Sequence, residues 1–139
     1  MVTAQQVLDT QIATVFITFL LWVFTLIPMR IAQRRSGYDN NNPRQGNDKL
    51  DGWGLRVLNA NANALEALVF ITAATTMNIF GARKDGGVGA ATMAFSIIFI
   101  ICRALHPILY HFEYAPHRSA SWGLSMLCVF VIFILAFVH

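Results

Sequence analysis

The sequence predicts an all-α integral membrane protein, built as an up-and-down bundle of four transmembrane helices. Of its 139 residues, 56% are hydrophobic and only 12% are charged, about half the charged fraction of a typical soluble domain. The apolar residues fall in four blocks, each long enough to cross a bilayer at about 1.5 Å per helical residue. Polar segments rich in turn-forming residues separate the blocks. We therefore expect a single transmembrane domain over residues 1–139.

Composition also argues against other classes of protein. The net charge of +3 is not accompanied by a basic face on a soluble module, so nucleic acid is not an expected partner. The two cysteines, Cys102 and Cys128, lie inside apolar runs and are expected to serve helix packing. Their number and spacing form neither a disulfide framework nor a metal-ligand pattern.

The first helix is expected over about residues 8–33, around an apolar run at 12–29. Asp9 precedes this run without a lysine or arginine, whereas Arg30, Arg34 and Arg35 follow it. This charge order does not fit a secretory signal peptide. By the positive-inside rule it places the N-terminus outside and the following loop, residues 36–54, in the cytoplasm.

Three further helices are expected at about residues 53–80, 88–112 and 118–138. The start of the third is rich in Gly, Ala, Ser and Met, which allows close helix approach. Pro107 is expected to kink its last turn. The short turn at residues 81–87 lies on the outer side, where the helix ends carry almost no charge.

A polar stripe marks the first half of the second helix. Arg56, Asn59, Asn63 and Glu66 are spaced by three, four and three residues, so a helix stacks them on one face. A carboxylate beside apolar sequence is costly unless it is paired. The stripe is therefore expected to face polar partners on other helices.

A second stripe lies near the end of the third helix, where Arg103, His106 and Tyr110 are spaced by three and four residues. In an up-and-down bundle both stripes lie at the cytoplasmic face, together with Arg30 and the start of the fourth helix at Arg118 and Ser119. This one-sided placement predicts a polar cavity that opens to the cytoplasm. Helix-to-helix hydrogen bonding is the alternative role for these groups.

Guanidinium groups outnumber carboxylates in this set, because four arginines accompany the single Glu66. Such a cavity suits a small, net-negative ligand whose amino group binds Glu66. The apolar walls would admit a lipophilic second molecule from the bilayer. A small carrier is a competing function, but the chain has no internal repeat, and its outer helix halves are not expected to form a polar path.

Two motifs match a known family. The first is Asn63-Ala64-Leu65-Glu66 with Arg56 upstream. The second is Arg103-x-x-His106-x-x-x-Tyr110 followed by Ala115-Pro116-His117-Arg118-Ser119. With these motifs the chain resembles the MAPEG family, the membrane-associated proteins in eicosanoid and glutathione metabolism, which include microsomal glutathione transferases, leukotriene synthase and prostaglandin E synthase.

The resemblance implies a homotrimer with sites between subunits, and glutathione as substrate or cofactor without a metal. It assigns Arg118 to holding the glutathione thiol as thiolate, with Ser119 as a hydroxyl donor. The implied glutathione-binding residues are Arg30, Arg56, Asn59, Asn63, Glu66, Arg103, His106 and Tyr110. Asn59 stands where the family often has an arginine, so it supplies a hydrogen bond but no charge.

The expected function is a glutathione-dependent transferase or peroxidase, with isomerase activity as a further option, in the bacterial inner membrane or the endoplasmic reticulum. The thiolate would attack an electrophilic carbon or a peroxide oxygen of a lipophilic substrate. The second motif looks most like the prostaglandin synthase branch, but the loop after Tyr110 is one residue shorter, so that substrate is not carried over. A non-catalytic scaffold with this fold is the alternative.

Overall fold

The computed structural model describes residues 2–37, 39, 41–42, 45–81 and 87–138. Across these residues it contains no strand. The elements are α1 (Ala4–Arg35), the 3-10 helix η1 (Gln45–Lys49), α2 (Gly52–Gly81), α3 (Gly87–His111) and α4 (Ala115–Leu135). All four α-helices are long and apolar enough to cross a membrane. The predicted class, an all-α integral membrane protein with four transmembrane helices, is confirmed.

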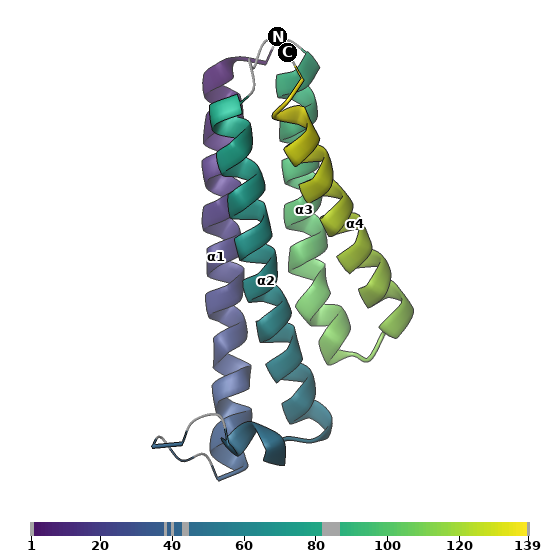
Figure 1. The fold of residues 1–139 in the computed structure, drawn as a ribbon. Helices are drawn as coiled ribbons and strands as arrows, with labels where there is room; N and C mark the ends of the chain where they lie inside the picture. The colour runs from purple at the N-terminus through teal and green to yellow at the C-terminus, as the bar shows by residue number, and fades with distance from the viewer. Residues whose placement is uncertain (1, 38, 40, 43–44, 82–86, 139) are drawn as a thin grey trace.

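The helices run up and down, as predicted (Figure 1). Both ends of the chain lie at one end of the bundle, and the α1–α2 connection and the α3–α4 turn lie toward the other. We call the latter the basic end, because α1 finishes there with Arg30, Arg34 and Arg35. The turn predicted between the second and third helices falls on residues 82–86, which lie outside the described residues, as do 38, 40 and 43–44 of the first loop.

The start of α4 differs from the sequence-based expectation. The helix begins at Ala115, with Pro116 in its first turn, a position that suits proline because its missing N–H has no helical partner there. The Arg118 N–H already donates to the Tyr114 carbonyl at 2.9 Å. The prediction that Arg118 opens the helix is therefore wrong, and Arg118 lies one turn inside it.

Apolar packing joins α2, α3 and α4 in a core that includes Ile71, Phe99, Cys128 and Ile132. Cys102 and Cys128 are both free and buried, in keeping with the packing role expected for them. The close fit continues to the end of α2, where a Cβ added to Gly81 would lie 2.5 Å from the Ala136 carbonyl oxygen. Any larger residue at 81 would push α4 away.

Hydrogen bonds of buried amide side chains link α1, α2 and α4 near the chain termini. Gln11 Nε2 on α1 donates to Asn78 Oδ1 on α2 at 2.7 Å, and Asn78 Nδ2 donates to the Ile132 carbonyl of α4 at 3.2 Å. Both amide residues are fully buried. The outer half of the bundle therefore contains buried polar side chains, and their hydrogen bonds hold three helices together.

Candidate functional site

An open cleft lies at the basic end, between residues contributed by α2, α3 and α4. Its volume is about 460 Å³, within the range of about 300–1,000 Å³ that is usual for small-molecule sites. The lining residues are Asn63, His106, Tyr110, Arg118, Ser119, Trp122 and Gly123. The cleft therefore brings together five residues predicted from the sequence, from both polar stripes and from the start of α4.

Aromatic contacts fix the position of Arg118. Its guanidinium carbon lies 4.2 Å from the centre of the Tyr110 ring, a distance at which the ring face attracts a cation. Tyr110 in turn meets His106 edge to face, with 5.4 Å between the ring centres. His106 and Tyr110 of α3 thus position the Arg118 guanidinium of α4 at the wall of the cleft.

Arg103 orients the amide of Asn63. Arg103 Nη1 donates to Asn63 Oδ1 at 2.8 Å. Since a guanidinium has only donors, Asn63 must turn its oxygen toward Arg103, which leaves its Nδ2 group to donate elsewhere. Asn63 lines the cleft, whereas Arg103 is only 4% exposed and does not. The structure therefore places Arg103 behind Asn63.

A comparison with protein-family models matches the MAPEG family over residues 10–138. This chain belongs to the MAPEG family. The match covers nearly the whole chain and confirms the resemblance inferred from the two motifs. Members of the MAPEG family are membrane proteins of eicosanoid and glutathione metabolism. Searches of curated proteins and of solved structures found no significant match.

Two arginines of the predicted MAPEG site lie away from the cleft. Arg56 Nη1 lies 2.6 Å from Glu113 Oε1, and Arg56 lines a separate cavity. Arg30 donates to Gln33 Oε1 at 3.1 Å and lines a groove along α1. Within one chain the predicted gathering of four guanidinium groups therefore does not form, and Arg118 is the arginine that lines the cleft.

Asn59 and Glu66 are exposed on α2. Glu66 lies three residues beyond Asn63, but it does not line the cleft of the same chain. Both lie in a membrane-spanning helix, where an exposed carboxylate is costly unless another group pairs with it. This outward face of α2 therefore requires a polar cover.

Trp122 and Gly123 complete the cleft, and the sequence analysis did not include them. Trp122 follows Arg118 by four residues and Ser119 by three, a spacing that puts these side chains on one face of a helix. This spacing was the signal that could have identified Trp122. Its ring gives the cleft an apolar wall beside the Arg118 charge.

The described part of the chain contains no cluster of three or more His, Cys, Asp or Glu side chains that could hold a metal ion. The donors that line the cleft are an amide, an imidazole, a phenol, a guanidinium and a hydroxyl. This set is suited to a polar anion that accepts several hydrogen bonds.

Proposed function

We propose that this protein is a glutathione-dependent membrane enzyme that acts on lipophilic electrophiles or lipid hydroperoxides. The observation that carries the proposal is the position of Arg118, stacked on Tyr110 at the wall of the cleft. Ser119 lines the same cleft, so a cation and a hydroxyl donor face one bound group. Glutathione would supply the sulfur nucleophile, for transfer to carbon or for reduction of a peroxide.

Arg118 is the residue to which we assign thiolate stabilisation. A guanidinium keeps its charge at every relevant pH, and an opposite charge nearby favours the ionised form of an acid such as a thiol. The first turn of α4 adds the positive end of the helix dipole. Ser119 contributes a hydroxyl that donates to the same anion.

The remaining lining groups would hold the peptide. Asn63 presents an amide N–H₂ to the cleft, because Arg103 occupies its oxygen. His106 and Tyr110 line the wall between Asn63 and Arg118. Glutathione carries two carboxylates and two peptide carbonyls, and these accept hydrogen bonds from such donors. Trp122 would face the lipophilic partner that arrives from the bilayer.

A homotrimer would complete the site. Arg30, Asn59 and Glu66 are exposed in the single chain, although the family resemblance assigns all three to glutathione binding. A second copy of the chain, packed against the outer face of α2, would cover Glu66 and bring its own Arg30 to the cleft of its neighbour. The charge order along the chain favours a site that faces the cytoplasm.

Two measurements test this function. Isothermal calorimetry on the purified protein in detergent should show glutathione binding, and thiol consumption should rise with a model electrophile. Binding without turnover, for both electrophiles and hydroperoxides, would favour the non-catalytic scaffold. Glutathione uptake into proteoliposomes in the absence of turnover would favour the carrier.

A further inference from the structure

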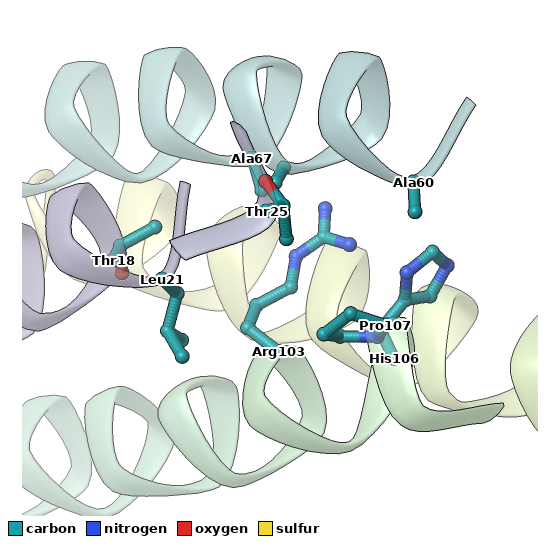
Figure 2. Close-up of a pocket in the computed structure, with 9 residues that line it drawn as sticks. Thr18, Leu21, Thr25, Ala60, Ala67, Arg103, His106 and Pro107 are labelled. Atoms are coloured by element: carbon teal, nitrogen blue, oxygen red, sulfur yellow. The ribbon is translucent and has the colours of Figure 1, made fainter. Parts of the chain in front are cut away.

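A second, much smaller cavity lies behind the cleft, inside a single chain. It is enclosed by residues of α1, α2 and α3 and has a volume of about 10 Å³. Its lining residues are Thr18, Leu21, Thr25, Ala60, Ala64, Ala67, Arg103, His106 and Pro107. Figure 2 shows the Arg103 side chain extending from α3 into this space, which Thr25 and Ala60 also line.

The Arg103 guanidinium enters this cavity with hydrogen-bonding capacity to spare. The residue is only 4% exposed, and Nη1 is engaged by Asn63. Its Nε and Nη2 atoms are buried and have no hydrogen-bond partner among the described residues. Buried donors almost always have a partner in native proteins, so these N–H groups point to an acceptor that is not part of the chain.

Thr25 also lines the cavity, and its hydroxyl oxygen can accept a further hydrogen bond. Its hydroxyl donates to the Trp22 carbonyl at 2.7 Å, so its proton is already used. The same oxygen accepts from Asn61 Nδ2 at 2.9 Å. Since a hydroxyl oxygen has two lone pairs, one remains. The lining of the cavity thus includes Arg103 donors without a partner among the described residues and a free lone pair on Thr25.

We propose that this cavity is a binding site for one water molecule that bridges Arg103 to Thr25. A cavity of about 10–15 Å³ is the smallest that holds a water, which needs two to four polar partners. Water accepts from the Arg103 N–H groups and donates to Thr25 Oγ1. A halide would accept from Arg103 but would face the lone pair of Thr25, and it is larger than the cavity.

A neighbouring cavity lies between the proposed water site and the basic end. Its volume is about 80 Å³ and it shares Thr25, Ala60 and Pro107 with the first. It extends to Arg56 and His111, which lie at the starting turn of α2 and the last turn of α3. The two cavities therefore lie against the same three residues, and the larger one lies toward the basic end.

The bridging water would extend a chain of hydrogen bonds from α1 to the cleft. The water would donate to Thr25 and accept from Arg103. Arg103 in turn donates to the Asn63 oxygen, which leaves the Asn63 N–H₂ group to donate to the ligand. Thr25 and Arg103 are positioning residues in this scheme, because neither lines the cleft. This step rests on the proposed function, whereas the water site itself does not.

The direct test is a crystal structure of the protein in lipid at a resolution that reveals ordered waters. We expect one density peak within hydrogen-bond distance of Arg103 and Thr25 Oγ1. An empty cavity would overturn the proposal. Crystals grown in bromide distinguish a halide from water, since an anomalous peak at this position would show an anion site instead.

The link to the cleft is tested with variants of α1 and α2. Thr25→Val removes the oxygen, Thr25→Ser keeps it, and Asn61→Leu removes the Asn61–Thr25 bond but leaves the hydroxyl. We expect Thr25→Val to lose the density peak and to weaken glutathione binding about two- to tenfold beyond Asn61→Leu, the equivalent of one hydrogen bond. Thr25→Ser should behave as wild type.

The outcomes separate the two proposals. Equal losses of affinity in Thr25→Val and Asn61→Leu would show that the water does not act on the cleft, and the positioning role would be wrong. If the wild-type protein binds no glutathione, the proposed function fails, while the density peak still decides the water site.

Discussion

The Arg56 guanidinium lies 2.6 Å from the Glu113 carboxylate, and this ion pair ties the first turns of α2 to the turn between α3 and α4. Glu113 has a φ of 62°, a left-handed conformation that costs roughly 1–2 kcal/mol for a residue other than glycine. The ion pair helps to hold that conformation. Glu113 lies two residues before the first residue of α4, and Arg118 follows it by five. The ion pair therefore helps to position the start of α4.

Reversing both charges tests whether Arg56 acts through Glu113 or binds the ligand. Glu113→Arg should lower turnover by at most about fivefold, because exposed ion pairs contribute about 1 kcal/mol or less. The double variant Arg56→Glu with Glu113→Arg should recover most of that loss, since the pair is restored with opposite polarity. The measurement is turnover and KM for glutathione in all four combinations.

A direct role of Arg56 in binding predicts the opposite pattern. The double variant would then be as poor as Arg56→Glu alone, and Glu113→Gln would leave KM unchanged. Hydrogen exchange at the backbone of residues 112–118 provides a reading that needs no substrate. Faster exchange in Glu113→Gln would confirm that the ion pair orders the turn.

The orientation of the Asn63 amide leads to a second prediction. Asn63→Asp keeps an oxygen for Arg103 but removes the N–H₂ group that faces the cleft. We expect the thermal midpoint to be unchanged or higher, because the bond to Arg103 becomes an ion pair. Glutathione affinity should fall by at least about tenfold, the equivalent of about 1.5–3 kcal/mol for a lost hydrogen bond to a charged group. Calorimetry and thermal denaturation measure the two effects.

Asn61→Asp is the comparison for this variant, because Asn61 uses its N–H₂ inside the protein. Its Nδ2 donates to Thr25 Oγ1 at 2.9 Å, and the residue is buried. Replacing it with Asp removes that donor, so the thermal midpoint should fall. If both variants lost stability and kept affinity, the Asn63 amide would not bind the ligand.

The helices and the main residues of the cleft could be predicted from the sequence. Spacings of three and four residues place His106 beside Tyr110 on α3, because a helix brings such residues onto one face. Up-and-down connectivity then brings Arg118 to the same end. These relationships are local or topological, and they need no knowledge of side-chain packing.

The partners of the arginines could not be obtained in the same way. Arg103 is buried behind Asn63 because the rotation of α3 against α2 is set by close packing, including the small residues Ala60 and Ala67 that line the cavity beside it. Arg56 pairs with Glu113 across 57 positions of sequence, through a turn whose conformation depends on tertiary contacts. Helical spacing predicts which residues share a face of one helix, but it does not predict which residues of different helices come into contact.

The orientation in the membrane is a separate prediction. Arg30, Arg34 and Arg35 lie at the end of the bundle opposite to both termini, so the positive-inside rule places the termini outside the cytoplasm. Thr3→Cys and Phe137→Cys should react with an impermeant maleimide in intact cells or right-side-out vesicles. Cys102 and Cys128 are buried, so background labelling should be low. Labelling only after permeabilisation would show that the termini lie in the cytoplasm and that the predicted orientation is wrong.

Glu66→Gln tests the exposed face of α2. In a homotrimer that covers this face, Glu66 would be the carboxylate that binds the amino group of glutathione. The variant should keep its oligomeric state and lose affinity by the equivalent of about 1–3 kcal/mol, the range for a hydrogen bond to a charged group. Native mass spectrometry and calorimetry measure these two properties. A trimer that dissociates in this variant would assign Glu66 to subunit packing instead.

The last prediction concerns Arg118, whose guanidinium lies 4.2 Å from the centre of the Tyr110 ring. Its charge favours thiolate over thiol, so bound glutathione should ionise at a lower pH than a free cysteine side chain, whose pKa is about 8.5. Arg118→Leu should abolish thiolate formation and turnover, while binding through Asn63 and the other donors largely persists. The measurement is ultraviolet thiolate absorbance of the bound ligand across pH, beside turnover with a model electrophile.

Two further variants separate the charge of Arg118 from its surroundings. Arg118→Lys should rescue thiolate formation only in part, because lysine keeps the charge but loses the planar fork. Tyr110→Phe keeps the aromatic ring beneath the guanidinium, so it should retain thiolate absorbance close to wild type. If Arg118→Leu keeps wild-type turnover and the same pH profile, thiolate stabilisation belongs to another donor. Loss of thiolate in Tyr110→Phe would then identify the Tyr110 hydroxyl, whereas its persistence would leave the Ser119 hydroxyl, which lines the same cleft, as the next candidate.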